Sequence, residues 1–230
     1  MEEGNNTVYL VAGYEISDEE QTTLLQEPAF NKYHTIAKSG LTTALKEYYA
    51  AATNTEKVLI LKSILDNIQF VELKRFSRSG CRLFAMCHSE NDLPSSDEFP
   101  GNLSLARKLM ANGYDVYMLG NPNGIRSADF IATKKNMVYY LEGKTMNGQR
   151  SLDELLSKAS SQSERVVIDI IGTDDIHYIV REIKNAFAHN LSLLEVILMN
   201  GSKMISVDRR RWGRKDFEKD LQNEWMGRKK

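Results

Sequence analysis

Apolar side chains in the first part of the chain recur with the spacing of amphipathic helices. Two such helices are predicted over residues 32–51 and 53–68, and a further helix is predicted to start at Ser17, where Ser17 and Glu20 have the spacing of a reciprocal cap. Thr53 and Glu56 have the spacing of a reciprocal N-terminal cap, which places the start of the second helix. Residues 1–95 are therefore predicted to form a helical region.

Beyond residue 95, short apolar runs suited to strands alternate with helical patterns. A stretch rich in Ser, Pro and Asp at 89–101 marks a linker, which divides the chain into 1–95 and 96–230. The predicted elements are a helix at 102–113, strands at 114–119, 125–133 and 137–145, a helix at 151–162, a strand at 165–171, a helix at 174–189, and a hairpin that turns at Asn200-Gly201. This order, αβββαβαββ, predicts an α/β (α+β) fold with a mixed sheet.

The second and third of these strands carry three charged side chains that packing alone does not require. Residues two apart in a strand project to the same face, so Glu142 and Lys144 share a face. Antiparallel pairing through a short turn near Lys135 would place Asp129 close to the Glu142 end. Two converging carboxylates favour a cation between them, and Mg²⁺ accepts one or two carboxylates together with water and phosphate oxygens. The pattern therefore predicts a Mg²⁺ or Mn²⁺ site and phosphodiester hydrolysis, with Lys144 beside the attacking water or the phosphate.

Composition narrows the class of protein. The chain has 230 residues, of which 42% are apolar and 27% are charged, as is ordinary for globular proteins. No apolar stretch approaches the roughly 20 residues of a membrane helix, and the N-terminus is acidic, so no membrane span and a cytoplasmic site of action are expected. Cys81, Cys87 and His88 lack a fourth ligand at zinc-like spacing and are interpreted as ordinary residues of a strand pair.

Positive charge gathers near the C-terminus. Residues 203–230 contain ten Lys or Arg against five Asp or Glu, and include the run Arg209, Arg210 and Arg211. Such a patch would attract phosphate backbones. A solvated helix with interspersed acidic residues is the other interpretation, and the sequence leaves both open.

About residues 100 to 207 resemble the PD-(D/E)XK phosphodiesterase superfamily, which has a restriction-endonuclease-like fold. Its members share an αβββαβ core, an aspartate at the start of the second strand, and an acid, any residue and a lysine on the third; Asp129, Glu142 and Lys144 match these positions. The resemblance implies that Asp129 and Glu142 bind the metal ion, with the Gly143 carbonyl as a candidate ligand. Lys144 would then serve the attacking water.

Two positions depart from the superfamily pattern. Ala128 stands where the superfamily's name has proline, at a position that is not catalytic. On the first core helix, where many members carry a metal-binding glutamate, the sequence has Asn102, and Glu98 is the nearest acid. The resemblance leaves open whether either of these residues completes the metal site.

More narrowly, "ARKLMANGYDVYML", "SADFIA" and "YYLEGKT", followed by a helix with Gln162, are similar to the C-terminal nuclease domains of contact-dependent growth inhibition toxins. Several of those domains cleave transfer RNA. The resemblance implies RNA, transfer RNA above all, as the substrate, and a cognate immunity protein as a partner. It also implies that Gln162 supports Lys144 or touches substrate, and that the chain is delivered as part of a secreted toxin.

The sequence thus predicts a metal-dependent endonuclease with Asp129, Glu142 and Lys144 as catalytic residues. The residues predicted to bind substrate are Arg126, Gln162, Arg209, Arg210 and Arg211. One alternative is a DNA endonuclease of a mobile element or defence system, and another is a non-catalytic nucleic-acid-binding module that retains the fold. For Glu142 and Lys144 by themselves, the alternative is a surface ion pair on an exposed sheet face.

Overall fold

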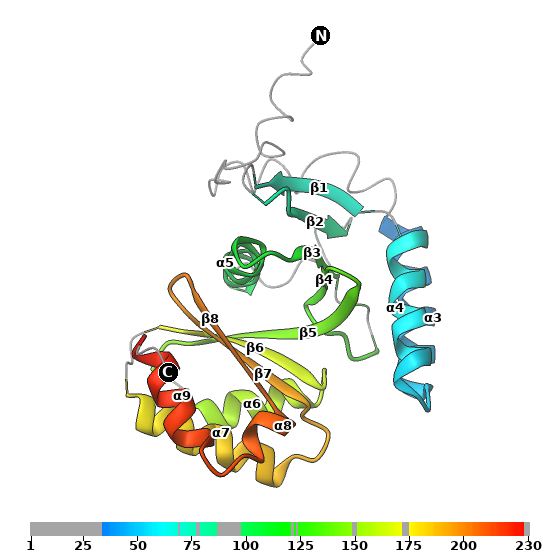
Figure 1. Ribbon diagram of the computed structural model, residues 1–230. Helices are drawn as coiled ribbons and strands as arrows, with labels where there is room; N and C mark the ends of the chain where they lie inside the picture. Colours follow the sequence, from blue (N-terminus) through cyan, green and yellow to red (C-terminus); the bar gives the residue numbers. More distant parts are fainter. Residues whose placement is uncertain are drawn as a thin grey trace. The chain divides into compact units, whose positions relative to one another are not determined.

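The computed structural model describes residues 34–68, 70–76, 79–86, 98–120, 122, 124–148, 151–171 and 175–227 (Figure 1). Contacts divide the chain into two compact units, residues 1–140 and 141–230. Each unit contains both parallel and antiparallel strand pairs, which confirms the predicted α/β class with a mixed sheet. The predicted division near residue 95 lies outside the described residues.

The described part of the first unit starts with two helices and continues into strands paired in the order β1-β2-β3-β4. Its elements are α3 (His34–Ala50), α4 (Asn54–Asn67), β1 (Phe70–Arg75), β2 (Arg82–Met86), α5 (Glu98–Ala111), β3 (Asp115–Met118), β4 (Phe130–Lys134) and the first residues of β5 (Met137–Met146). Helices α3 and α4 confirm the helices predicted over 32–51 and 53–68, and the helix predicted to start at Ser17 lies outside the described residues. The strand pair β1 and β2 was not predicted, because residues 1–95 were expected to be helical. Cys81 directly precedes β2, whereas Cys87 and His88 lie outside the described residues.

The cap predicted for α4 is present. The Thr53 hydroxyl accepts a hydrogen bond from the Glu56 amide at 3.2 Å, and the Glu56 carboxylate accepts one from the Thr53 amide at 2.9 Å. The Thr53 amide and the Thr53 hydroxyl both donate to the Glu56 carboxylate, and these two bonds lower the pKa of Glu56, because they stabilise its ionised form. Both helices then bury apolar side chains in one cluster with residues of the strands, including Leu41, Leu45, Leu61, Ile64, Met86 and Ile131.

The strand that follows Asp129 is shorter than predicted. Strand β4 begins at Phe130 rather than Ile125, and pairs antiparallel with β3, with Met118 opposite Phe130. After β4 the chain reverses through Lys135 and Asn136, and Lys135 has a φ of 55° in the left-handed region. Asp129 therefore lies in irregular backbone directly before the strand, where its side chain is not committed to the sheet's alternation.

The second unit pairs its strands in the order β5-β6-β7-β8, with β5, β6 and β7 parallel and β8 antiparallel. Its further elements are α6 (Leu152–Ser160), β6 (Arg165–Ile170), α7 (Ile176–His189), β7 (Glu195–Asn200), β8 (Lys203–Asp208), α8 (Arg209–Trp212) and α9 (Phe217–Trp225). From α5 onward the elements therefore follow the predicted order αβββαβαββ, and the turn at Asn200-Gly201 is confirmed.

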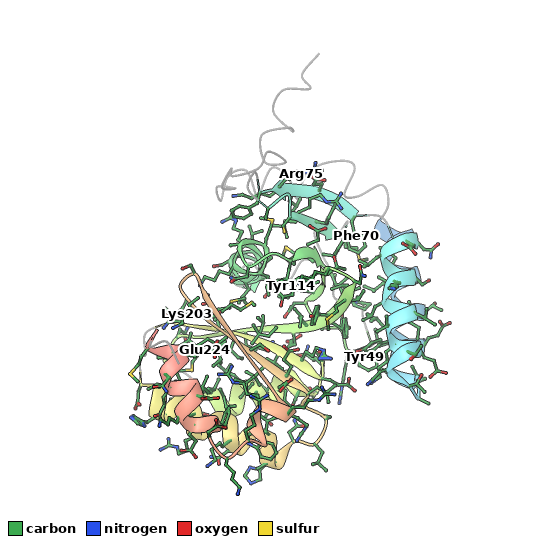
Figure 2. All side chains as sticks on the ribbon, in the orientation of Figure 1. Tyr49, Phe70, Arg75, Tyr114, Lys203 and Glu224 are labelled. Atoms are coloured by element: carbon green, nitrogen blue, oxygen red, sulfur yellow. The ribbon has the colours of Figure 1, made fainter. Side chains whose placement is uncertain are left out.

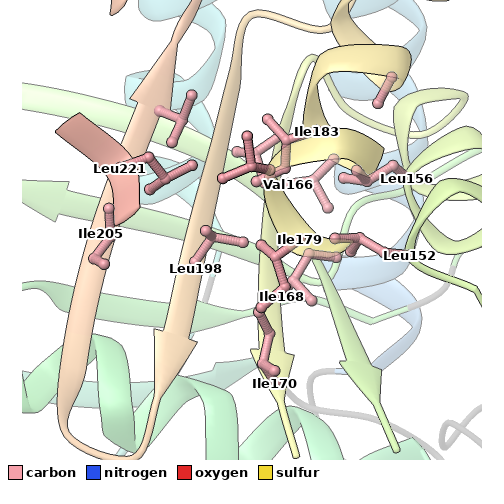
Figure 3. Close-up of a cluster of buried hydrophobic side chains, with 14 of the residues drawn as sticks. Leu152, Leu156, Val166, Ile168, Ile170, Ile179, Ile183, Leu198, Ile205 and Leu221 are labelled. Atoms are coloured by element: carbon pink, nitrogen blue, oxygen red, sulfur yellow. The ribbon is translucent and has the colours of Figure 1, made fainter. Parts of the chain in front are cut away.

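One face of these strands is covered by α6, α7 and α9 (Figure 1). Figure 3 shows the apolar side chains of the strands, among them Val166, Ile168 and Leu198, pointing at those of the helices. Burying apolar surface contributes about 25 cal/mol for each Å², and this is the main stabilising term for such a layer. This core also contains Met146 at the end of β5, so the helix-covered face extends to that strand.

The C-terminal helix α9 is part of this core rather than a solvated extension. Phe217, Leu221 and Trp225 lie one helical turn apart and are buried in the cluster. Lys203 on β8 donates to the Trp225 carbonyl at 2.7 Å and to the Glu224 carbonyl, which satisfies the end of the helix; Figure 2 labels Lys203 and Glu224 side by side. No helix among the described residues is long and apolar enough to cross a membrane.

Candidate active site

Asp129 is held in the first unit by bonds to its backbone and to its carboxylate. It directly precedes β4, which agrees with the predicted position at the start of the second core strand. Its backbone carbonyl accepts a hydrogen bond from the Leu119 amide at 2.8 Å. This bond continues the pairing of β3 with β4 by one residue, so the position of the Asp129 backbone follows from the sheet.

The carboxylate of Asp129 accepts a hydrogen bond from Asn102 on α5. The distance from Asn102 Nδ2 to Asp129 Oδ1 is 2.8 Å, and both side chains are half-buried. The departure from the superfamily pattern at Asn102 thus lies directly beside the predicted metal ligand. The side chain of Glu98, the other residue considered for this place, lies outside the described part of the chain.

Tyr140 fixes the peptide that precedes Asp129. Its hydroxyl accepts a hydrogen bond from the Ala128 amide at 2.8 Å, and only 3% of the residue is exposed. Burial raises the pKa of Tyr140 well above its usual value, and the neighbouring hydroxyl of Tyr49 at 3.5 Å raises it further. The sequence showed two adjacent tyrosines on opposite faces of a strand, but nothing in it indicated that one of them would anchor this segment.

Glu142 and Lys144 lie on β5 in the second unit and form an ion pair. Lys144 Nζ donates to Glu142 Oε1, as the spacing of two residues along a strand predicts. The Glu142 side chain is 1% exposed and that of Lys144 is 28% exposed. The alternative of a surface pair on an exposed sheet face is therefore wrong for Glu142.

The register of β5 with β6 identifies the face that carries this pair. Glu142 is opposite Val166 and Lys144 is opposite Ile168, and both partners belong to the core beneath the helices. Glu142 and Lys144 therefore project to the helix-covered face, while Gly143 projects to the other. Gln162 follows α6 and lies four residues before Val166, so the chain brings it to the same end of this strand pair as Glu142.

Asp169 is a buried acid that the motif analysis missed. It lies on β6 opposite Thr145 and is 2% exposed. Strand parity places it on the face opposite to Glu142 and Lys144. The available signal was an aspartate inside the otherwise apolar run "RVVIDII", which is costly to bury without compensating bonds.

The three consecutive arginines predicted to bind nucleic acid have different environments. Arg209 donates to the carbonyls of Phe187, at 3.2 Å, and Asn190, and its guanidinium lies over the rings of Phe187 and Trp212. It therefore caps the C-terminal end of α7, where a positive charge is favourable.

The other two arginines differ again. Arg211 donates to the Ser206 carbonyl at 2.7 Å and pairs with Glu224. Arg210 is exposed, as are Arg214 and Lys215 further along and Arg126 in the segment before Asp129. Arg210, Arg214 and Lys215 thus contribute outward-facing positive charge, whereas Arg209 and Arg211 hold elements of the second unit together.

The donor set of the predicted metal site fits a hard divalent ion. Carboxylate oxygens are the ligands that Mg²⁺ prefers, and each carboxylate has about four lone-pair sites, so a bond from Asn102 still allows Asp129 to bind a cation. Within the described part of the chain, no group of three or more His, Cys, Asp or Glu side chains could hold a metal ion. Asp129 and Glu142 belong to different units, and their convergence stays a prediction.

Comparison with family models, with curated proteins and with solved structures finds no match to this chain. Membership of the PD-(D/E)XK superfamily therefore stays a prediction that depends on the three motif residues and on the order of elements around them.

Proposed function

We propose that this chain is a metal-dependent phosphodiesterase. The observation that carries the proposal is the burial of Glu142, 1% exposed and paired with Lys144, at the acid-x-lysine position of a strand. Within that class we propose an endonuclease that acts on RNA, with transfer RNA as the preferred substrate because of the resemblance to toxin nuclease domains.

Energetic reasoning supports a chemical role for this pair. Removing a carboxylate and an ammonium from water is expensive, and apolar residues of similar volume commonly stabilise a core at least as well as a buried ion pair does. Buried acids with a specific charged partner are correspondingly frequent at functional sites. The flanking order αβββαβ also supports the proposal, because it is the order of elements in the superfamily that the sequence resembles.

The proposed roles follow from the chemistry of each side chain. Asp129 and Glu142 would hold a Mg²⁺ or Mn²⁺ ion through carboxylate oxygens. When bound, such an ion polarises the phosphate and favours ionisation of a water molecule. The Lys144 ammonium has three donor protons, so it can bond Glu142 and also orient the attacking water or stabilise charge on a phosphate oxygen.

The substrate contacts we propose come from exposed cations and from Gln162. Arg126 is exposed three residues before Asp129, and Arg210, Arg214 and Lys215 are exposed on the second unit. Guanidinium and ammonium groups bind phosphates by charge-assisted hydrogen bonds. Gln162, at the Glu142 end of the strand pair, would support Lys144 or touch the substrate.

Cleavage assays test this proposal. Purified chain would be incubated with transfer RNA and with plasmid DNA, in Mg²⁺, in Mn²⁺ and in chelator. We expect cleavage of transfer RNA that requires the metal ion and falls about a thousandfold in Glu142→Ala and in Lys144→Ala.

A matched control is Glu182→Gln, which removes another buried acid that is paired with a base, Arg181 at 3.0 Å, but lies outside the motif. It should retain activity. Absence of cleavage of both substrates with either metal ion would contradict the enzyme. Cleavage of DNA alone would reassign the substrate, and cleavage that survives both motif substitutions would show that other residues carry the chemistry.

A further inference from the structure

We propose that Asn102 is a positioning residue, whose amide holds the carboxylate of Asp129 in the orientation in which it binds a divalent ion. This inference rests on the metal site of the proposed function. The motif itself assigns no role to this asparagine.

Three contacts near Asp129 are of two kinds: two place its backbone, and the third acts on its carboxylate. Leu119 bonds the Asp129 carbonyl, and Tyr140 bonds the amide of the preceding residue, both at 2.8 Å. These two bonds fix where the Cα of Asp129 lies. They leave its side-chain torsions unspecified, and the bond from Asn102 to Oδ1 is a contact that acts on those torsions directly.

The hydrogen-bonding chemistry of Asn102 suits orientation better than metal binding. An ionised carboxylate only accepts hydrogen bonds, so the Asn102 atom that faces Oδ1 is the Nδ2 donor, which carries no lone pair for a cation. A carboxylate at this position would present acceptors only and would repel Asp129 when no ion is bound. The neutral amide supplies the donor without adding charge, so Asn102 acts on an ion through Asp129.

The position of Asn102 makes this orientation rigid. It lies on α5, which packs against β2 and β3, so the amide is presented by a helix rather than by a loop. Partners that orient metal ligands in this way typically change metal affinity or activity by about 10- to 100-fold when they are removed. Loss of the Asn102 donor should therefore weaken metal binding at the lower end of that range.

Binding of Mn²⁺, measured by electron paramagnetic resonance, tests this without any substrate. We expect the Kd for Mn²⁺ to rise about tenfold in Asn102→Leu, which has a similar volume and no donor, and to recover in part in Asn102→Gln, which keeps the amide. Asn112→Leu is the matched control. Asn112 directly follows the same helix, α5, and its side-chain amide donates to the Lys108 carbonyl at the end of the helix away from Asn102. Its Kd should stay within about twofold of the wild-type value.

A measurement on the unaltered chain avoids dependence on the folding of the variants. In ¹H–¹⁵N spectra, adding Mg²⁺ should shift the side-chain amide signal of Asn102 and leave that of Asn112 in place.

Cleavage assays of the variant give a further test. Asn102→Leu should raise the Mg²⁺ concentration for half-maximal rate about tenfold, with the KM for RNA unchanged.

The results separate this inference from the proposed function. An unchanged Mn²⁺ affinity in Asn102→Leu, a silent Asn102 amide on Mg²⁺ addition, or no Mn²⁺ binding by the wild-type chain would each overturn the positioning role. Mn²⁺ binding that Asn102→Leu weakens, in a chain that cleaves neither RNA nor DNA, would support the positioning role and contradict the endonuclease.

Discussion

The two acids of the predicted metal site are held in place by opposite means. Glu142 sits within a strand of the second unit, and its partner Lys144 is two residues away on the same strand. Asp129 lies before a strand in the first unit, and its neighbours Asn102, Leu119 and Tyr140 come from other elements. The comparison teaches that strand geometry alone can pair two side chains, whereas orienting a residue outside a strand requires contacts from distant parts of the chain.

The largest effect should come from breaking the local pair. Lys144→Met leaves the Glu142 carboxylate buried without its ammonium partner, so we expect a loss of about 2 kcal/mol in the free energy of unfolding and about a thousandfold in cleavage. Adding Glu142→Gln removes the uncompensated charge and should restore most of the stability but none of the cleavage. Urea unfolding and transfer-RNA cleavage measure the two quantities. A double variant as unstable as Lys144→Met would contradict the electrostatic explanation.

Breaking a contact from a distant part of the chain should have a smaller effect on cleavage. Tyr140→Phe removes the acceptor for the Ala128 amide, and we expect a loss of about 1–2 kcal/mol in the free energy of unfolding. Cleavage should fall less than in Lys144→Met, because the catalytic side chains remain. The control is Tyr139→Phe, whose hydroxyl contacts Met137 Sδ at the surface. Equal losses for the two tyrosines, measured by urea unfolding, would argue against the anchoring role of Tyr140.

The exposed basic side chains of the second unit can be compared with Arg209, which bonds to carbonyls within that unit. The triple variant Arg210→Ala, Arg214→Ala and Lys215→Ala should weaken RNA binding and make its logarithmic salt slope shallower by about 2, with stability unchanged. Arg209→Met should instead lower the free energy of unfolding by about 1–2 kcal/mol and leave the salt slope as it is. Filter binding at several salt concentrations, with urea unfolding, distinguishes them. An unchanged slope in the triple variant would exclude this region from the substrate contacts.

The smallest effects should come from the helix caps, one in each unit. Thr53→Ala and Ser151→Ala each remove a hydroxyl that accepts an amide hydrogen bond at 3.2 Å, and each should lower the free energy of unfolding by about 1 kcal/mol.

The cap at Thr53 should also make stability depend on pH. Because bonds from Thr53 lower the pKa of Glu56, their stabilisation is present above the ordinary value of 4.5 and is lost as the pH falls through the lower pKa of the folded state. Thr53→Ala removes the bond from the hydroxyl but keeps the bond from the backbone amide, so it should reduce the acid sensitivity of unfolding only in part. Equal acid sensitivity in wild type and variant would contradict a contribution from the hydroxyl bond.

Much of the secondary structure could be read from the pattern of apolar residues, because that pattern repeats over several turns or strand positions. Helix α7 and the hairpin at Asn200-Gly201 lie close to where periodicity and turn chemistry placed them. Strand β4 was predicted five residues too early, since the apolar residue Ile125 precedes the strand without belonging to it. The C-terminal segment shows the limit of charge patterns: its basic and acidic residues surround an apolar stripe that is buried in the core.

In the candidate site, too, the sequence determined some features and the tertiary structure determined the others. The sequence by itself determined that Glu142 and Lys144 share a face, because alternation along a strand is a local property of the backbone. Only the tertiary structure decided that Glu142 is buried, that Asn102 donates a hydrogen bond to Asp129, and that Arg209 points inward while Arg210 is exposed. Each of these depends on which residues, tens of positions away, pack against the side chain. Such contacts are selected by the free energy of the whole fold and leave no periodic trace in the chain.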